Sequence, residues 1–536
     1  MPRIPSFLTS PGITWKGLDM SPSPFRRAVA LTLTLGLTLA QGITVRTPLG
    51  PALGQIEKGA IAFYGLPYAQ ANRFEAPRPV AAWPPGVGRE RVACPQTLGT
   101  PARLGGYLPP QREDCLVANL FLPLELPPPE GFPVMVYLHG GGFTSGSAAE
   151  PIYEGHRLAQ EGVVVVSVNY RLGPLGFLAL PALAKEDPKA VGNYGLLDLV
   201  EALRFVQRYI RYFGGNPQNV TLFGESAGGM LVCSLLATPE AQGLFHRAIL
   251  QSGGCHQVRP LEKDFPFGER WARNLGCSPE DLACLRHLPL SRLFPPEEPK
   301  APPDITAAVL GFPLSPFKPH LGALLPENPL EALGQGRARG IPLLVGANLE
   351  ELAFPTLAWL LGPRTWEEFS GRLAAQGIPP KEREALTKAY QRRFPDSRKA
   401  WGEAQTDLQL LCPSLKAARL QAPFAPTYAY LFTFRVPGWE GLGAFHGLEL
   451  APLFGNFEEM PFLPLFLSAE ARERAEALGK RMRRYWVSFA REGEPWGWPR
   501  WPTYEEGYLL RLDEPPGLLP DPYGERCGAL EALGLL

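Results

Sequence analysis

Short apolar runs rich in valine, isoleucine and leucine recur along the chain from residue 133 onward. Several contain almost no polar position, which is typical of strands in a sheet that is covered on both faces. The pattern predicts strands at 133–138, 163–170, 220–223, 247–250, 341–347 and 427–434. A further run at 507–512 predicts a last strand at the edge of the sheet.

A helical pattern separates the second and third predicted strands. Between residues 192 and 215, apolar side chains recur at the spacing of one helix face: Leu196, Val200, Leu203, Val206 or Ile210, and Phe213. Gly214 is expected to end this helix. The order strand, helix, strand predicts a parallel α/β sheet.

The remaining pattern predicts helices around this sheet. Residues 257–340 are rich in proline and weakly patterned, which favours a helical insertion over one end of the sheet. Residues 468–491 predict a long helix. Since no internal repeat is present, we expect one large domain over residues 41–536.

The charges of the chain balance. It carries 52 Lys and Arg against 52 Asp and Glu in 536 residues. Without a cationic excess, binding to nucleic acid or to an anionic membrane surface is not expected. The expected partner is a small molecule.

The first forty residues have the layout of a secretory signal. After Met20, the basic pair Arg26 and Arg27 precedes an apolar stretch from Ala28, and small residues end at Ala40. The stretch is shorter than the ~20 residues of a membrane span. We predict a signal peptide at 20–40 and a secreted or periplasmic protein. A buried strand or helix is the alternative, and either Met1 or Met20 is compatible with the start.

Eight cysteines accompany this signal. They form no C-x-x-C motif and no Cys/His cluster at zinc spacing. In an exported chain they favour disulfides over a metal site. No metal or cofactor is expected.

Ser226 lies in a G-x-S-x-G pattern within T-L-F-G-E-S-A-G-G-M at 221–230. Alone the pattern is weak, because a chain this rich in glycine matches it by chance about 0.2 times. Its setting is stronger, since a strand precedes it and a helix-compatible run follows. At such a turn Oγ is lifted clear of the sheet, and the helix N-terminus faces developing negative charge. The position predicts a nucleophile.

A glycine-rich loop, H-G-G-G-F at 139–143, directly follows the first predicted strand. Glycines let backbone N–H groups approach a carbonyl oxygen, and one such oxyanion donor is worth about 3 kcal/mol in the transition state. We predict that Gly141, Gly142 and Ala227 are the donors and that His139 supports the loop. A flexible turn is the alternative.

His446 is the only histidine after residue 320 and lies in a glycine-rich loop behind the strand at 427–434. In α/β proteins with a nucleophilic serine at such a strand-to-helix turn, the catalytic acid and then the base follow the serine along the chain. His446 is therefore the predicted base. The acid is expected after the strand at 341–347, where the pattern does not separate Glu350 from Glu351. The alternative is a structural histidine and two solvated carboxylates.

From residue 43 to the C-terminus the chain resembles the type-B carboxylesterases, the α/β-hydrolase family that includes cholinesterases and bacterial para-nitrobenzyl esterases. The matching stretches are F-Y-G-L-P-Y-A at 63–69, E-D-C-L-V-A-N-L-F-L-P at 113–123, H-G-G-G-F-T-S-G at 139–146, V-N-Y-R-L-G-P-L-G-F-L at 168–178, the run 192–229, L-Q-S-G at 250–253 and H-G-L-E-L at 446–450. The resemblance implies an α/β-hydrolase fold, with a mostly parallel sheet, helices on both faces and helical insertions over the active-site end.

The family's order of oxyanion loop, serine, acid and histidine carries over to Ser226, Glu351 and His446. Glu351 is preferred because the family's acid loop resembles G-x-N-x-D-E-G, although Leu352 stands here in place of the last glycine. Ser252 matches a serine that supports the acid in the family.

The resemblance also implies disulfides and a substrate class. The pairs Cys94–Cys115, Cys277–Cys284 and Cys412–Cys527 resemble the family's three disulfides, which leaves Cys233 and Cys255 as expected free thiols. Cholinesterases hold a quaternary ammonium on a tryptophan inside the first disulfide loop. Here that loop contains no tryptophan, and its one aromatic residue is Tyr107. This favours a neutral carboxylic ester over a choline ester as substrate.

The expected function is a serine carboxylesterase that works through an acyl-enzyme intermediate. One alternative is a binding protein on the same fold, such as the neuroligins, which lose the nucleophile. Another is a serine peptidase or amidase with the same three residues. This chain carries all three residues, and nothing in it indicates specialisation for the poor leaving group of an amide.

Overall fold

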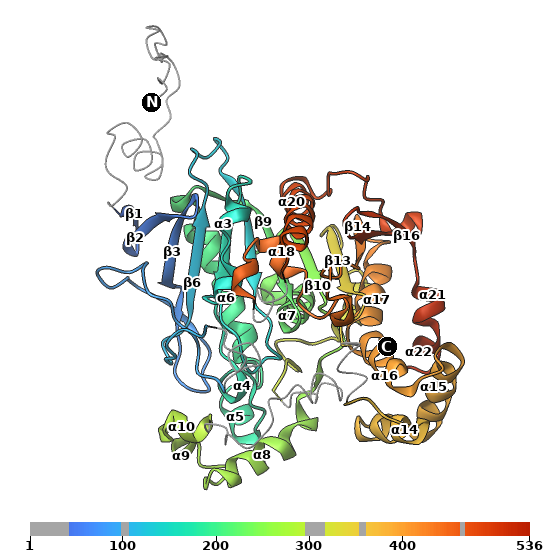
Figure 1. Cartoon of the computed structure of the whole chain (residues 1–536). Helices are drawn as coiled ribbons and strands as arrows, with labels where there is room; N and C mark the ends of the chain where they lie inside the picture. Colours follow the sequence, from blue (N-terminus) through green and yellow to red (C-terminus); the bar gives the residue numbers. More distant parts are fainter. Residues whose placement is uncertain (1–41, 98–106, 295–316, 353–360, 461–466) are drawn as a thin grey trace, which may run out of the picture.

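Among the residues that the structure describes, twelve strands form one twisted sheet that extends across the molecule (Figure 1). The structure is a computed structural model, and it describes residues 42–97, 107–294, 317–352, 361–460 and 467–536. The predicted signal peptide at 20–40 lies outside these ranges. None of the described helices is long and apolar enough to cross a membrane.

Seven adjacent strands in the middle of the sheet run parallel to one another. In spatial order they are β8 (Val164–Val168), β7 (Phe132–Leu138), β9 (Gly215–Glu225), β10 (Arg247–Gln251), β13 (Leu343–Asn348), β14 (Thr427–Phe432) and β15 (Tyr508–Leu512). Most of their residues are buried, as expected for parallel strands covered on both faces. The predicted mostly parallel α/β sheet is confirmed.

Antiparallel strands complete the sheet on both sides. On one side lie β1 (Ile43–Thr47), β2 (Gly50–Glu57), β3 (Ala60–Pro67) and β6 (Val117–Leu122). On the other side, β16 (Gly517–Pro520) pairs with β15. The prediction that 507–512 forms the edge is therefore wrong. β16 was not predicted because its four residues are too few to show a strand pattern. Its last residue, Pro520, is compatible with an edge strand.

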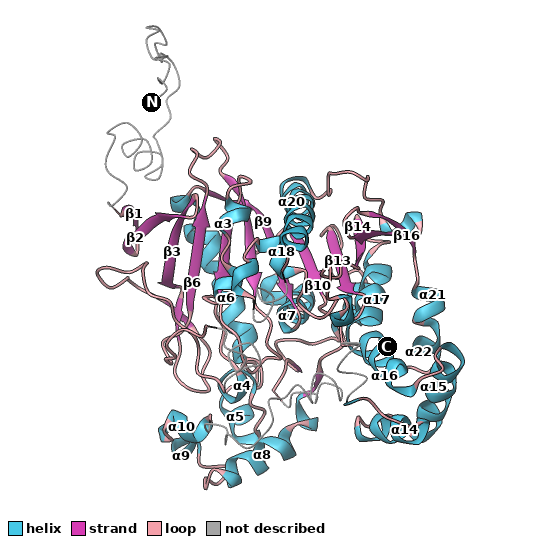
Figure 2. Cartoon of the chain, in the orientation of Figure 1, coloured by secondary structure: helices cyan, strands magenta, loops and turns pink. Residues whose placement is uncertain are grey.

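Alternate residues of the strands face two separate helical layers (Figure 2). Within β7, Val134 and Val136 point into one core, whereas Met135 and Tyr137 point into the other. The first layer contains α6 (Tyr194–Tyr209), α7 (Ala227–Ala237) and α17 (Cys412–Gln421). The second contains α3 (His156–Ala159), α18 (Leu450–Phe454) and α20 (Ala469–Glu492). Alternation along each strand thus places the sheet between the two layers.

Both long helices predicted from the sequence are present. The first is α6, which continues as a 3₁₀ turn to Phe213 and ends at Gly214 with φ of 79°. The second is α20, whose N-cap Ser468 accepts a hydrogen bond from the amide of Ala471. Local capping signals therefore set these boundaries.

Shorter helices gather at one end of the sheet. The lower part of Figure 1 contains α4 (Gly173–Phe177), α5 (Pro181–Glu186), α8 (Phe265–Asn274), α9 (Leu282–His287) and α10 (Leu290–Leu293). The last three, with α12 (Pro329–Gly334), confirm helices within the predicted insertion at 257–340. A second group was not predicted: α14 (Trp366–Ala375), α15 (Pro380–Arg393), α16 (Ser397–Thr406) and, near the C-terminus, α21 (Tyr523–Arg526) and α22 (Gly528–Ala532).

Candidate active site

Ser226 lies at the sharp turn between β9 and α7. Its φ of 54° and ψ of −126° are strained for a residue with a side chain, at a typical cost of 1–3 kcal/mol. A Cβ on Gly228 would lie 2.0 Å from the carbonyl oxygen of Leu138, and one on Gly224 would lie 2.5 Å from the backbone of Gly228. The flanking glycines are thus required by close packing of the turn. The side chain of Ser226 remains partly accessible, at 8% exposure.

The structure brings Ser226, His446 and Glu351 together. His446 Nε2 lies 2.8 Å from Ser226 Oγ, and His446 Nδ1 lies 2.6 Å from Glu351 Oε2. The three residues come from the turn after β9, the loop after β14 and the loop after β13. They are far apart in sequence but meet at the carboxyl ends of three parallel strands of one sheet.

Two backbone-linked contacts hold the acid. Glu351 Oε1 accepts a hydrogen bond of 2.7 Å from the amide of Asn348. The amide of His446 donates to the carbonyl oxygen of Glu351 over 3.1 Å. The side chain of Asn348 donates to the carbonyl oxygen of Phe445 over 2.7 Å, which ties the two loops together.

Three carboxylates surround His446, and two of them were missed in the sequence. Glu225 Oε1 lies 3.2 Å from His446 Nε2, without hydrogen-bond alignment, and Glu449 is buried and accepts from Asn348 Nδ2 over 2.7 Å. Burial raises the pKa of Glu225 to about 8 and the pKa of Glu449 to about 7. Burial alone would lower the pKa of His446, but the charges of Glu225 and Glu351 outweigh it, so that pKa is raised above its usual value.

A sequence signal for Glu225 exists, because this residue directly precedes Ser226 in the G-x-S-x-G motif. The sequence shows where Glu225 lies in the motif, but it does not show that Glu225 approaches His446, because that contact depends on a loop more than 200 residues further along the chain. Glu449 also stands in a recognised motif, since it follows His446 in H-G-L-E-L, but its burial beside the histidine was not predicted. In both cases the contact is made only by the folded chain.

The glycine loop ends β7 beside Ser226. Gly141 and Gly142 have φ of 110° and 61°, and a Cβ on Gly142 would meet no atom within 4 Å. Within the described part of the chain, the amides of Gly141, Gly142 and Ala227 donate no hydrogen bond to another residue. Three free donors near one serine can stabilise a negative oxygen.

His139, the first residue of this loop, holds the loop backbone in place. Its Nδ1 lies 2.8 Å from the carbonyl oxygen of Gly140, and its ring stacks on Tyr170 with centroids 4.5 Å apart. Burial lowers the pKa of His139 to about 4, so the ring is neutral. The hydroxyl of Tyr170 donates to the carbonyl oxygen of His139 over 2.9 Å. The residue holds the backbone without carrying charge.

Ser252 lies beside the acid loop, but its hydroxyl does not contact Glu351 by a hydrogen bond. Its Oγ is buried and has no partner among the described residues. Its amide donates to the carbonyl oxygen of Gly346 in β13 over 2.8 Å. The backbone of Ser252 therefore joins the end of β10 to the strand that leads into the acid loop.

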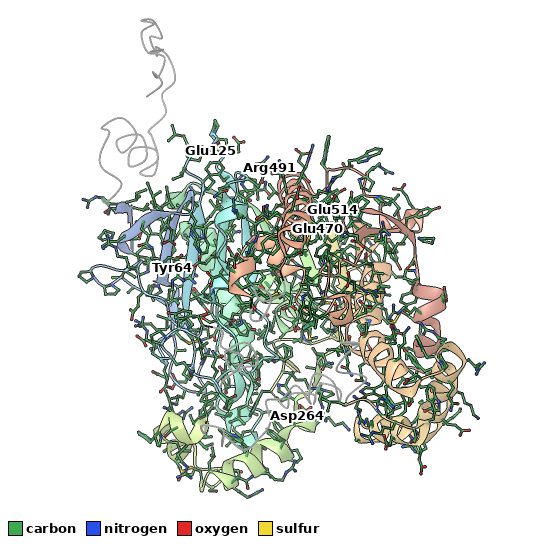
Figure 3. The ribbon with its side chains drawn as sticks, viewed as in Figure 1. Tyr64, Glu125, Asp264, Glu470, Arg491 and Glu514 are labelled. Carbon is green, nitrogen blue, oxygen red and sulfur yellow. A yellow bond between two sulfur atoms is a disulfide. The ribbon has the colours of Figure 1, made fainter. Side chains whose placement is uncertain are left out.

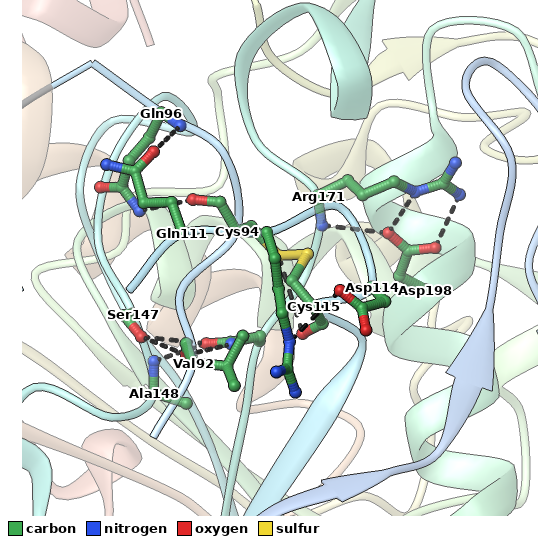
Figure 4. The surroundings of a disulfide bond; sticks show 12 residues. Val92, Cys94, Gln96, Gln111, Asp114, Cys115, Ser147, Ala148, Arg171 and Asp198 are labelled. Atoms are coloured by element: carbon green, nitrogen blue, oxygen red, sulfur yellow. Dashed lines mark hydrogen bonds and ion pairs between the residues drawn. A yellow bond between two sulfur atoms is a disulfide. The ribbon is translucent and has the colours of Figure 1, made fainter. Parts of the chain in front are cut away.

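The disulfide Cys94–Cys115 (Figure 4) closes a loop that contacts Gly146, three residues after the glycine loop. Gln96, within this loop, donates to the carbonyl oxygen of Gly146 and accepts from its amide, each over 2.8 Å. Tyr107, the aromatic residue of the loop, is 51% exposed. Residues 98–106 lie outside the described part of the chain.

Four disulfides are present, and the fourth corrects an expectation. Besides the three implied pairs, Cys233 is bonded to Cys255 with Cα atoms 5.5 Å apart. The expectation that these two are free thiols is wrong. Cys233 is on α7 and Cys255 follows β10, and α7 packs directly on β10, so the fold brings the two sulfurs together.

No group of three or more His, Cys, Asp or Glu in the described residues is arranged to hold a metal ion.

Comparison with known proteins agrees with this arrangement. A model of the carboxylesterase family matches residues 41–527. A para-nitrobenzyl esterase of Bacillus subtilis (strain 168) is 34% identical over 497 residues, covering 90% of this chain and 97% of the relative. A fumonisin B1 esterase of Sphingopyxis macrogoltabida is 33% identical over 548 residues, covering 95% and 93%. A solved PNB esterase structure has a TM-score of 0.78 at 33% identity, covering 91% of this chain and 99% of that one. The chain therefore has the α/β-hydrolase fold, belongs to the carboxylesterase family and is a carboxylic ester hydrolase.

Proposed function

We propose that this protein is a serine carboxylesterase that hydrolyses neutral carboxylic esters through an acyl-enzyme, with Ser226, His446 and Glu351 as the catalytic triad. The observation that carries the proposal is the pair of hydrogen bonds at His446, 2.8 Å to Ser226 and 2.6 Å to Glu351. A serine hydroxyl is a weak nucleophile, and a neighbouring imidazole held by a carboxylate activates it.

In the proposed reaction His446 takes the proton of Ser226 as Oγ attacks the ester carbonyl. The amides of Gly141, Gly142 and Ala227 stabilise the oxyanion, and His446 then protonates the leaving alcohol. Water attacks the acyl-enzyme after losing a proton to the same histidine. Glu351 keeps the imidazole oriented and stabilises its cationic form.

Two alternative functions are less well supported than this proposal. A binding protein on the same fold would not need a strained serine in contact with a histidine, and strain of this kind clusters at functional sites. An amidase would share the triad, and comparison of matched ester and amide substrates separates it. Two relatives are named as esterases, a para-nitrobenzyl esterase and a fumonisin B1 esterase, and this favours ester cleavage here as well.

We also propose that the protein is secreted or periplasmic. Four disulfides in one chain support an oxidising compartment, since reducing compartments keep thiols free. The signal peptide itself remains a proposal, tested by N-terminal sequencing of the exported protein. A mature end far from Gln41 would contradict it.

The first test is release of para-nitrophenol from its butyrate ester. Wild type should turn over, and Ser226→Ala should lose about 10⁴-fold or more of kcat with the fold intact. Ser278→Ala, at an exposed serine of the insertion, is the matched control and should keep full activity. Equal inactivity of folded wild type and Ser226→Ala on a panel of neutral esters would overturn the proposal.

A further inference from the structure

The glycine loop lies between two buried side chains. His139 begins the loop and Phe143 ends it, and the two are only 1% and 4% exposed. The three glycines between them have no side chain, and Gly141 is exposed. Because glycine backbone is conformationally permissive, the direction of the Gly141 and Gly142 amides depends on what holds the two ends. His139 holds the first end through its stack on Tyr170, and Phe143 stands at the second end.

Phe143 has a backbone conformation that is rare for an aromatic residue. Its φ is 65°, in the left-handed region that favours glycine. Gly141 and Gly142, directly before it, also have positive φ, so three consecutive residues share this unusual geometry. A strained conformation of this kind persists only where the surrounding structure enforces it, and such strain is concentrated at functional sites.

One short helix, α4, enforces the conformation of Phe143. The carbonyl oxygen of Phe143 accepts a hydrogen bond of 2.8 Å from the amide of Gly173, the first residue of α4. The ring of Phe143 meets the ring of Phe177, the last residue of α4, edge to face, with centroids 5.7 Å apart. The backbone and the side chain of Phe143 are therefore held by the same helix.

The helix α4 is in turn held by α6. The two helices pack together, Phe177 is fully buried, and a Cβ on Gly195 of α6 would lie 2.7 Å from its ring. The ring of Phe177 thus lies directly on the backbone of a long helix that packs on the sheet. Asp264, the N-cap of α8, marks in Figure 3 the end of the molecule where α4 lies. The position of Phe143 is set by the sheet through two helices.

The loop that Phe143 ends lies directly against the nucleophile. A Cβ on Gly140 would lie 3.0 Å from the Cβ of Ser226. The carbonyl oxygen of Gly141 accepts a hydrogen bond of 3.0 Å from the amide of Ser145, which closes a turn around Phe143. A shift of Phe143 therefore moves the predicted oxyanion donors relative to Ser226. Misplacement of catalytic groups by 1 Å can cost about 100-fold in rate.

We propose that Phe143 is a positioning residue of the oxyanion hole: packed on Phe177, it fixes the amides of Gly141 and Gly142 where negative charge develops on the substrate. The inference rests on the proposed function and adds a residue to it. Because the oxyanion is present in the transition state and not in the bound ester, loss of this support lowers kcat more than it changes KM.

The kinetic test uses two substitutions of different size. Phe143→Ala removes the ring but keeps a side chain at the strained position. Its kcat on para-nitrophenyl butyrate should fall about 100-fold, with KM within about threefold of wild type. Phe143→Leu retains an apolar anchor and should recover most of this loss. The acid limb of the pH profile should stay in place in both variants, since neither changes a charge near His446.

An aliphatic trifluoromethyl ketone reports on the oxyanion hole directly. Ser226 Oγ adds to its carbonyl carbon, the hydroxyl proton passes to His446, and the former carbonyl oxygen becomes an oxyanion that faces the predicted donors. The inhibition constant should rise in Phe143→Ala by the same factor by which kcat/KM falls. A variant that loses kcat but binds the ketone as tightly as wild type would contradict the inference.

Phe74 offers a matched control, because it has the same strain and the same burial. It lies between β4 (Ala69–Gln70) and β5 (Arg78–Pro79), has φ of 60° and is 2% exposed. Its ring meets that of Tyr194 edge to face, with centroids 6.4 Å apart. Phe74→Ala should lose stability but keep kcat and ketone affinity. If folded Phe143→Ala keeps full kcat, or if both alanine variants lose kcat equally, the inference is wrong.

Two further measurements keep the test decisive. Phe177→Ala removes the support of the ring and replaces Phe143→Ala if that variant does not fold; the same losses are expected, and unchanged kcat would overturn the inference. If folded wild type cleaves no ester, the proposed function fails, and hydrogen exchange then tests the anchor. The amides of Thr144 and Ser145, which donate to Gly141, should exchange faster in the Phe143 variant than in wild type and Phe74→Ala. Equal exchange in all three proteins would refute it.

Discussion

Glu350 and Glu351 are adjacent in the chain but hold opposite sides of the loop that carries His446. Glu351 binds the imidazole at 2.6 Å. Glu350 binds Arg435 Nε at 3.1 Å and accepts a hydrogen bond of 2.6 Å from the amide of Ala444, two residues before His446. One carboxylate orients the ring, and the other clamps the backbone that presents it.

This division predicts different effects of two neighbouring substitutions. Glu351→Gln should lower kcat about 10⁴-fold, because an amide cannot stabilise the imidazolium and favours the wrong tautomer. Glu350→Gln should cost about tenfold or less, since its amide oxygen can still accept from Ala444. Both are measured as kcat on para-nitrophenyl butyrate. Arg435→Met is the partner control for Glu350→Gln, and equal losses in the two glutamate variants would contradict the assignment.

The pH dependence of activity should report the carboxylates around His446. The base must be neutral to accept a proton, so activity rises as pH increases through its pKa, which nearby carboxylates raise. Glu225→Gln removes one of these charges, so the acid limb of kcat/KM should move to lower pH by about one unit. Glu440→Gln, at an exposed acid of the same loop between β14 and α18, is the control. An acid limb that moves to higher pH in Glu225→Gln would refute this explanation.

Substitutions in the glycine loop should separate geometry from strain. Gly141→Ala would place Cβ 2.1 Å from the carbonyl oxygen of Ser145, so the loop must move and kcat should fall about 10²- to 10³-fold. Gly142→Ala meets no atom and should mainly lose about 1 kcal/mol of stability through its φ of 61°. Gly243→Ala, with φ of 76° and open space, is the control for strain alone. Similar kcat values for both loop variants would argue against the predicted donors.

The disulfide Cys233–Cys255 should contribute to stability. Its residues are 22 apart, and closing a loop of that length stabilises the fold by about 3 kcal/mol in the chain-entropy model. The double variant Cys233→Ala/Cys255→Ala should melt at a lower temperature than wild type. Peptide mapping without reduction should recover the two cysteines linked, and alkylation of either one in the unreduced protein would show that they are free thiols.

The candidate site was only partly accessible to sequence reasoning. Ser226 and the glycine loop could be predicted because a tight turn and a close approach of backbone need glycine at fixed local spacing. His446 could be predicted because no other histidine follows residue 320. Glu350 and Glu351 could not be separated by pattern, since adjacent residues share every local signal and differ only in what lies opposite each side chain.

Local sequence determined the parallel strands, the two long helices and the turn that strains Ser226, because periodicity, capping and glycine act between neighbours in the chain. Tertiary structure alone decided which carboxylates surround His446 and that Cys233 meets Cys255. Those contacts join segments from different strand ends, so their energies depend on packing that no short stretch of sequence encodes.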